Sequence, residues 1–512
     1  MAPARGTTLA LLGVTLFVVT MAAGAVTAPD RGVAGPGANT PTPTPAGTDA
    51  PGTDAGPPGT DAGPPGTDAG PPGTDDGTPV PDGPRTLVGV QGGWVTHGNI
   101  QLYADGAEAW RETSADGYFE VTMLDDGTVL AAFANESSSD CGDLSAPCAR
   151  TGFRHVDPDA PSGPEVVSEY SFPVGSITNS EVHAVDRVRE DTYVFTDMDA
   201  ERVVMVEDGS EVWEWRASSF YEAPEDPTSS DWLHINDVDH IGDERFLVSV
   251  RNANQILVIE RGEGVVEVVN EDDGGSDSTC RQDGRLVDAD GDGDVRCGDP
   301  GVFREQHNPQ WIGPGAVLVA DSDNDRVVEV HRTEDGDWEP AWVVTQAAGL
   351  GLNWPRDADR LPNGNTLITD SLNKRVVEVD RNGTAVWSVD TSGPSGPNIP
   401  YEADRLPYGE FAGRFAPPTA GNGSTPTPTP AGVTDLPTAS GDGDGVGETG
   451  GEIPFLSLAV TGMRGTFAWI PLWFGELHLA VTVVSLVLVV GGGVDNLVQS
   501  GFFGRIRSRI ER

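Results

Sequence analysis

A repeated pattern is the feature that most restricts how this chain of 512 residues can fold. Copies of the pattern start at Phe119, His183, Asn236, His307, Arg356 and Tyr401. A full copy reads as a strand, a polar turn, a strand, an Asp/Asn-rich turn, a third strand, another turn and a final strand that contains tryptophan in most copies. Four antiparallel strands repeated at roughly 45–70 residues predict the blades of a β-propeller.

Six starts predict an all-β, six-bladed β-propeller. The copy at Tyr401 is cut short, so we expect the segments Thr86–Gln91 and Asn99–Trp110 to complete its blade and close the ring. An all-β sandwich is the alternative, because short strands separated by turn residues also fit that fold.

Low-complexity segments flank the repeats. Residues 39–83 hold three GTDAGPP copies and residues 417–450 hold a Pro/Thr tract, and such tracts form extended stalks without a core. The expected parts are a signal peptide or N-terminal membrane anchor at 1–30, a stalk at 31–83, the propeller at 84–416, a second stalk at 417–452, and an interfacial segment, transmembrane helix and basic tail at 453–512.

Two apolar runs bear on the location of the propeller. The uncharged run Gly6–Pro29 follows Arg5 and suits either a cleaved signal peptide or a retained anchor. Leu477–Val494 carries no formal charge and predicts a transmembrane helix, with a buried core helix as the alternative. Four arginines follow this second run, so the positive-inside rule places the C-terminus in the cytoplasm and the propeller on the extracellular side of the cell membrane.

The charge balance excludes one class of function. The chain has 80 Asp and Glu against 31 Lys and Arg, a formal net charge of −49. A protein that binds nucleic acid through basic patches needs lysine and arginine, so no nucleic-acid partner is expected. An acidic excess of this size is typical of halophilic proteins, and a carboxylate-rich surface stays soluble.

The four cysteines all lie in the repeat region, as two close pairs. Cys141 is near Cys148, and Cys280 is near Cys297. In an exported domain this spacing favours two local disulfides, although four cysteines allow three connectivities. A zinc site is disfavoured, because neither pair has CxxC spacing and no histidine adjoins them.

The repeat starts predict where a functional site lies. The innermost strand of each blade lines the central channel, so the six starting residues should form a ring at one mouth. His183 and His307 belong to this ring, and His234 lies two residues before Asn236, so three of the eight histidines gather there. Such clustering favours a functional site over three separate structural histidines.

Short motifs around this ring resemble a known family. His234-Ile235-Asn236-Asp237-Val238, followed by Ser249-Val250-Arg251-Asn252, is similar to the arylsulfate sulfotransferases, six-bladed propellers that use no nucleotide sulfate. Gln306-His307 and Glu181-Val182-His183 fit the same pattern. The segments Ala320–Val330 and Thr369–Asp380 also resemble NHL-type propeller repeats.

The resemblance implies transfer of a sulfuryl group from an aryl sulfate to a phenol through a sulfated histidine, with no cofactor required. His307 would be the nucleophile, and His183 and His234 would be acid/base or oxyanion partners. Asn236 and Arg251 would hold the sulfate oxygens. Arg356 and Tyr401 lie at ring positions to which the resemblance assigns no role.

General chemistry agrees with this implication and leaves alternatives open. Sulfuryl transfer needs a neutral imidazole, a proton donor for the leaving phenolate and fixed positive charge on the oxygens. Three imidazoles also suit zinc or copper, although nearby arginines would repel a cation. A non-enzymatic NHL-like propeller that binds proteins or glycans at the cell surface is the other alternative. The oligomeric state cannot be derived from the sequence.

One acidic segment predicts a structural calcium site. From Asp288 to Asp299 the segment has the alternating acidic positions and central glycine of a calcium loop, with aspartate in place of the final glutamate. The candidate ligands are Asp288, Asp290, Asp292, Asp294 and Asp299. The alternative is that Asp-Gly runs arise from composition alone in so acidic a chain.

Overall fold

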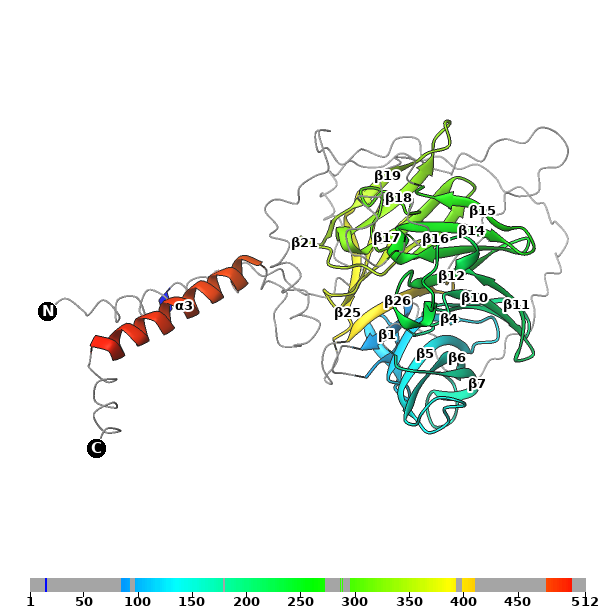
Figure 1. The fold of residues 1–512 in the computed structure, drawn as a ribbon, viewed down its shortest axis with the longest axis horizontal. Helices are drawn as coiled ribbons and strands as arrows, with labels where there is room; N and C mark the ends of the chain where they lie inside the picture. Colours follow the sequence, from blue (N-terminus) through cyan, green and yellow to red (C-terminus); the bar gives the residue numbers. More distant parts are fainter. Residues whose placement is uncertain are drawn as a thin grey trace, which may run out of the picture.

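Six four-stranded antiparallel sheets form the propeller in a computed structural model of the chain (Figure 1). The structure describes residues 14–15, 84–92, 97–177, 180–271, 286, 288, 295–392, 398–409 and 476–499. The predicted six-bladed fold is confirmed, and the sandwich alternative is wrong, because each repeat forms its own sheet.

The blades are numbered in chain order, and each begins with its innermost strand. Blade 1 contains β4 (Gly117–Met123), β5 (Val129–Ser138), β6 (Cys148–Asp157) and β7 (Glu165–Val174). Blade 2 contains β8 (Val185–Arg189), β9 (Thr192–Asp197), β10 (Arg202–Glu207) and β11 (Ser210–Arg216). Blade 3 contains β12 (Ile235–Gly242), β13 (Arg245–Val250), β14 (Gln255–Glu260) and β15 (Gly264–Val269).

The remaining blades continue in the same way. Blade 4 contains β16 (His307–Gly313), β17 (Ala316–Asp321), β18 (Arg326–Arg332) and β19 (Trp338–Val344). Blade 5 contains β22 (Asp357–Arg360), β23 (Thr366–Asp370), β24 (Arg375–Val379) and β25 (Ala385–Asp390), after a small β20 (Gln346–Ala347) and β21 (Leu350–Gly351) hairpin. Blade 6 contains β26 (Ile399–Leu406), β1 (Arg85–Gly92), β2 (Asn99–Ala104) and β3 (Ala107–Glu112). Four 3₁₀ turns, η1 (Ala217–Ser219), η2 (Pro227–Ser229), η3 (Arg251–Ala253) and η4 (Ser322–Asn324), complete this region.

The ring closes by pairing the two ends of the repeat region. Strand β26 pairs antiparallel with β1, with Leu87 opposite Asp404. In Figure 1 the yellow β26 lies beside the blue β1. The predicted completion of the truncated repeat is therefore confirmed. Neither end of the propeller can leave the ring without breaking a sheet.

Carboxylates on the inner strands connect neighbouring blades. The Glu120 carboxylate accepts the Val185 N–H of the next blade at 2.7 Å, and Glu402 accepts the Val121 N–H at 3.0 Å. The equivalent donor position for Asp237 is Pro309, which has no N–H. Burial, reinforced by nearby Asp357 and Asp186, raises the pKa of Asp237 well above its usual value.

Each blade interface is also packed with apolar side chains. Val203 and Met205 of blade 2 join Phe246, Val248 and Leu257 of blade 3 in one fully buried cluster. Burying a side chain of this size stabilises the fold by about 1.5–3 kcal/mol. These interfaces fix how the inner strands sit around the channel.

The cysteine predictions are confirmed as far as the structure describes them. Cys141 and Cys148 form a disulfide. Cys297 is also disulfide-bonded, and its predicted partner Cys280 lies outside the described residues. The calcium prediction stays untested, because Asp290, Asp292 and Asp294 lie outside the described residues. Of the two described candidates, Asp299 accepts the Gly301 N–H at 2.7 Å, as in a tight turn.

The predicted C-terminal helix is present as α3 (Glu476–Gln499). Within the described part of the chain, however, no helix meets the length and hydropathy needed to span a membrane. The transmembrane assignment is therefore not confirmed. Both predicted stalks and nearly all of the predicted signal or anchor segment lie outside the described residues.

Candidate functional site

The inner-strand starts meet at one end of the channel, as the repeat predicted. The Tyr401 ring lies at the centre of this cluster. Its centroid is 5.2 Å from that of His183, 5.9 Å from that of His307 and 5.4 Å from that of Phe119. His183 in turn lies 5.3 Å from His234. The structure therefore brings all three predicted histidines into one buried site.

Hydrogen bonds determine the tautomer of His307. Its Nδ1 lies 3.1 Å from the Glu305 carbonyl oxygen and 2.8 Å from the Ser322 hydroxyl. A carbonyl can only accept, and Ser322 donates its own proton to the Pro355 carbonyl at 2.7 Å. Nδ1 must therefore carry the hydrogen, which leaves the lone pair on Nε2. Burial, together with nearby arginines, lowers the pKa of His307 well below its usual value and keeps the ring neutral.

His234 has the same tautomer for a different reason. Its Nε2 lies 2.9 Å from Nη1 of Arg251, which can only donate, so Nε2 accepts. Its Nδ1 then donates to the Asp231 carboxylate at 2.7 Å. Since both ring nitrogens of His234 are hydrogen-bonded, this histidine is a positioning group and not a second nucleophile.

A buried carboxylate fixes the backbone that carries His234. Glu201 accepts the N–H groups of Leu233, His234 and Ile235 at 3.0, 2.7 and 3.0 Å. His234 adopts a left-handed backbone conformation with φ of +57°. Such a conformation in a bulky residue costs about 1–3 kcal/mol and is found where the surrounding structure enforces it, often at functional sites.

Blade 3 differs from other blades at the end of its second strand, where Arg251 lies, and this difference can be read from the sequence. In three other blades an aspartate at the end of the second strand pairs with an arginine opposite it, as Asp321 pairs with Arg326 at 2.5 Å. Blade 3 has Val250 and Gln255 at these positions, and Arg251 follows where blade 4 has Ser322. Aligning the repeats would have marked Arg251 as the arginine that blade geometry does not require.

Arg251 is already neutralised in the structure. Its Nη2 lies 3.1 Å from the Glu305 carboxylate, while Nη1 contacts His234. Asn236 is also engaged, because its Nδ2 donates to the Gln306 carbonyl at 2.8 Å. Both residues that the resemblance assigned to sulfate therefore hold protein groups around His234 and His307.

His183 and Tyr401 contribute polar atoms that are not satisfied. Within the described residues, His183 Nδ1 and the Tyr401 hydroxyl are buried and make no hydrogen bond. Burial lowers the pKa of His183 well below its usual value and raises that of Tyr401 well above its own. A neutral imidazole and a protonated phenol therefore face the site.

Two further residues, to which the sequence assigned no role, complete the site. The Arg356 guanidinium lies 4.1 Å from the centroid of the Trp354 ring and 5.0 Å from that of Tyr401. Glu181 is close enough for its charge to interact with Arg356, and burial raises the pKa of Glu181 to about 7. Glu181 can therefore exchange a proton near neutral pH.

The geometry does not support the metal alternative. No group of three histidine, cysteine, aspartate or glutamate side chains is placed to hold a metal ion in the described part of the chain, which includes all three histidines. The charge of Arg356 beside these imidazoles would also repel a cation. The arrangement is suited to an anion.

A family model agrees with this chemistry. Residues 186–392 match the arylsulfotransferase (ASST) family. The matched arylsulfotransferase region runs from blade 2 to blade 5 and includes His234, Arg251, His307 and Arg356, while His183 and Tyr401 lie just outside it.

The matches to solved structures are at low identity and low TM-score. No curated protein matches the chain in sequence. A protein of unknown function from Bacteroides caccae is 13% identical, over 63% of this chain and 99% of that one, with a TM-score of 0.40. A periplasmic gluconolactonase from Pseudomonas aeruginosa is 12% identical, over 63% and 98%, with a TM-score of 0.36. A virginiamycin B lyase from Staphylococcus aureus is 10% identical, over 62% and 88%, with a TM-score of 0.33.

Proposed function

We propose that this propeller transfers a sulfuryl group from an aryl sulfate to a phenol through a sulfated histidine at His307. The observation that carries the proposal is the tautomer of His307, because its Nδ1 donates to a carbonyl and leaves a neutral Nε2 lone pair among cationic and neutral donors. The arylsulfotransferase match over residues 186–392 supports the reaction class.

In the first step Nε2 of His307 attacks the sulfur of the donor. The N–S bond forms, the bond from sulfur to the aryl oxygen breaks, and the phenolate leaves. The ring becomes cationic, so its Nδ1–H bond to the Glu305 carbonyl strengthens as the transition state forms. Glu181, which is protonated in about half of the molecules at a pH near its pKa of about 7, donates a proton to the leaving oxygen.

The second step reverses the first with a different phenol. The acceptor oxygen attacks the sulfur, its proton passes to ionised Glu181, and the N–S bond breaks to restore neutral His307. No cofactor enters either step. The oxidising compartment that disulfide formation requires also supports a location outside the cytoplasm. We therefore propose an exported propeller in a high-salt environment, while a membrane anchor at Leu477–Val494 stays a prediction.

The test is turnover by the purified full-length protein. Incubation with 4-nitrophenyl sulfate and a phenol in high salt should release 4-nitrophenol and produce the sulfated acceptor, and quenching without acceptor should leave the SO₃ group on the His307 peptide. Absence of release, together with no sulfated peptide, would reject the enzyme and favour the non-enzymatic binding propeller.

A further inference from the structure

Arginines that are buried in this propeller fall into two kinds. Three arginines are almost inaccessible among the described residues: Arg154 is 4% exposed, Arg356 is 7% exposed and Arg405 is 3% exposed. Each guanidinium lies against an aromatic ring, at 3.6 Å from Phe133, 4.1 Å from Trp354 and 4.2 Å from Trp387 respectively. The three therefore have the same kind of apolar support and differ in their polar partners.

Two of the three are neutralised by a glutamate. Arg405 pairs with Glu378 at 2.6 Å and donates to the Thr86 hydroxyl at 2.6 Å. Arg154 pairs with Glu169 at 2.8 Å. Burying an unpaired charge is costly, so a buried arginine with a structural role is expected to have such a partner.

Arg356 has no such partner. Its side chain makes no ion pair within the described residues, and the one hydrogen bond that the guanidinium makes there is to the neutral side-chain oxygen of Gln91. Its Nε is buried without a hydrogen-bond partner in the same part of the chain, but this also holds for Arg154 and Arg405, so the three differ in their ion pairs. The Glu181 carboxyl acts on Arg356 through its charge but forms no ion pair with it. Among the described residues, the positive charge of Arg356 is thus held in the site without an ion-pair partner.

Two neighbours of Arg356 also have buried polar atoms without a hydrogen-bond partner in the part of the chain that the structure describes. The Tyr401 hydroxyl and His183 Nδ1 are also buried and unpartnered in the described residues. Tyr401 touches both Arg356 and His183, so the three groups form one cluster beside His307. A tetrahedral anion would accept from the arginine and the phenol, and a buried imidazole N–H would donate to it as well.

Local backbone strain also holds this cluster in place. Trp354 adopts φ of +51°, which is unusual for a bulky residue. Its N–H is held by the Asp325 carboxylate at 2.7 Å. Its indole then lies 6.0 Å from the His307 ring and directly under Arg356. The strained turn fixes the guanidinium next to the proposed nucleophile.

We propose that Arg356, with the Tyr401 hydroxyl and His183, is the site that binds the sulfuryl oxygens, and that Arg251 is a positioning residue for His234. The inference rests on the proposed function for the identity of the anion. It reverses the assignment implied by the family motifs, in which Arg251 and Asn236 hold the sulfate and Arg356 has no role.

The test is calorimetric binding to the full-length protein in a His307→Ala background, which prevents turnover. The probes are 4-nitrophenyl sulfate, inorganic sulfate and 4-nitrophenyl phosphate. Arg356→Met, which keeps packing between the two rings, should weaken both sulfate probes by about 10- to 100-fold, the loss of a charge-assisted bond. Arg251→Gln should change the affinity for the sulfate probes less than about threefold. It should also remove the His234 Nε2 hydrogen-bond signal in nitrogen NMR, and Arg251→Lys should restore that signal.

The outcomes separate the inference from the proposed function. Equal or greater loss with Arg251→Gln than with Arg356→Met would overturn the inference, and so would preference for the aryl phosphate. Sulfate binding that depends on Arg356, in a protein that shows no turnover as wild type, would support the pocket and reject the transferase. Absence of binding by all three probes would reject both.

Discussion

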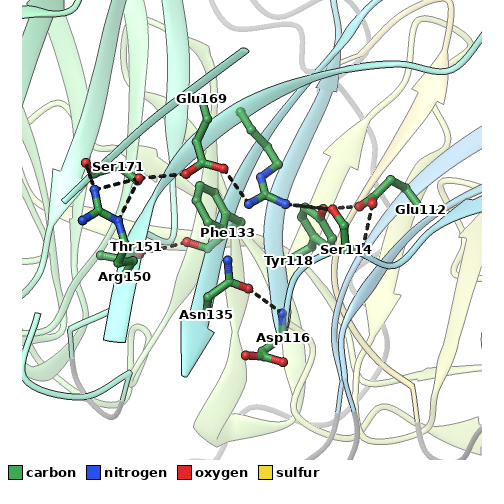
Figure 2. Close-up of polar contacts among 11 residues, drawn as sticks. Glu112, Ser114, Asp116, Tyr118, Phe133, Asn135, Arg150, Thr151, Glu169 and Ser171 are labelled. Carbon is green, nitrogen blue, oxygen red and sulfur yellow. Dashed lines mark hydrogen bonds and ion pairs between the residues drawn. The ribbon is translucent and has the colours of Figure 1, made fainter. Parts of the chain in front are cut away.

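Two polar clusters of this propeller are built around buried arginines, and they differ in how completely their members are paired. Around Arg154 in blade 1, Ser114 and the Tyr118 hydroxyl each accept from Nη1 at 3.0 Å, and Glu169 accepts from Nη2 at 2.8 Å. Tyr118 donates onward to Glu112. Figure 2 shows how the labelled members of this cluster, Glu112, Ser114, Tyr118 and Glu169, lie near one another among the strands.

At the channel mouth, among the described residues, a similar set of side chains lacks the carboxylate partners that the Arg154 cluster has. Arg356 has a tyrosine and an aromatic platform, as Arg154 has, but Tyr401 donates to no described carboxylate and no described glutamate pairs with the guanidinium. The presence or absence of a carboxylate partner therefore distinguishes a structural buried arginine from one that is available to bind a ligand. A buried network that serves only the fold pairs its charges internally, while a binding site leaves a charge and its donors for the ligand.

The largest expected effect is on the rate of sulfuryl transfer, which should depend on the channel-mouth cluster and not on blade 1. His307→Ala removes the proposed nucleophile, so sulfuryl transfer should fall by about 10³-fold or more, as when a covalent nucleophile is removed. The half-exposed His155 of blade 1 provides the matched control, and His155→Ala should leave the rate unchanged. Initial rates of 4-nitrophenol release check the pair. Equal rates for the His307 variant and the wild type would remove the covalent mechanism.

The second expectation compares the two arginines by stability. Arg154→Met leaves Glu169 without its cation and the Ser114 and Tyr118 hydroxyls without their donor. It should lower the free energy of unfolding by about 1–3 kcal/mol. Arg356→Met removes an unpaired buried charge and should leave that free energy unchanged or raise it by about 1 kcal/mol. Denaturant unfolding of both variants in anion-poor buffer measures the difference. A larger loss for Arg356→Met would mean that Arg356 has a structural role.

The smallest expectation concerns pH. Burial raises the pKa of Glu181 to about 7, so below that pH the carboxyl is neutral and Arg356 is left for the anion. Above it, ionised Glu181 competes, and anion affinity should fall severalfold between pH 6 and pH 8, a range set by that pKa. Asp231 and Arg356 are the charged groups that act on Glu181. Calorimetry with inorganic sulfate checks this, and Glu181→Gln should remove the dependence; an unchanged dependence in that variant would assign it to another group.

The sequence predicted the ring well because propeller geometry is periodic. Equivalent positions on inner strands must meet at one mouth, so Phe119, His183, His307 and Tyr401 could be placed together from the repeat alone. Blade closure through Tyr401 followed from the truncated copy by the same logic. These predictions needed only the hydrophobic pattern and the order of the copies.

The polar details could not be predicted, because they depend on which partners are missing. Nothing in the local sequence shows that Arg356 lacks a carboxylate partner among the described residues while Arg405 has Glu378. The contact between Gln91 and Arg356 joins residues 265 positions apart. Motif similarity pointed to Arg251 as the sulfate ligand, and only its contacts with Glu305 and His234 reveal that its charge is already used.

The most direct measurement is a crystal structure of the full-length His307→Ala protein with 4-nitrophenyl sulfate bound. We expect the sulfuryl oxygens to lie within hydrogen-bond distance of the Arg356 guanidinium and the Tyr401 hydroxyl, while Arg251 keeps its contacts with Glu305 and His234. A sulfuryl group held by Arg251 and Asn236, with Arg356 stacked on Trp354 and out of its reach, would show that Arg356 does not bind the substrate.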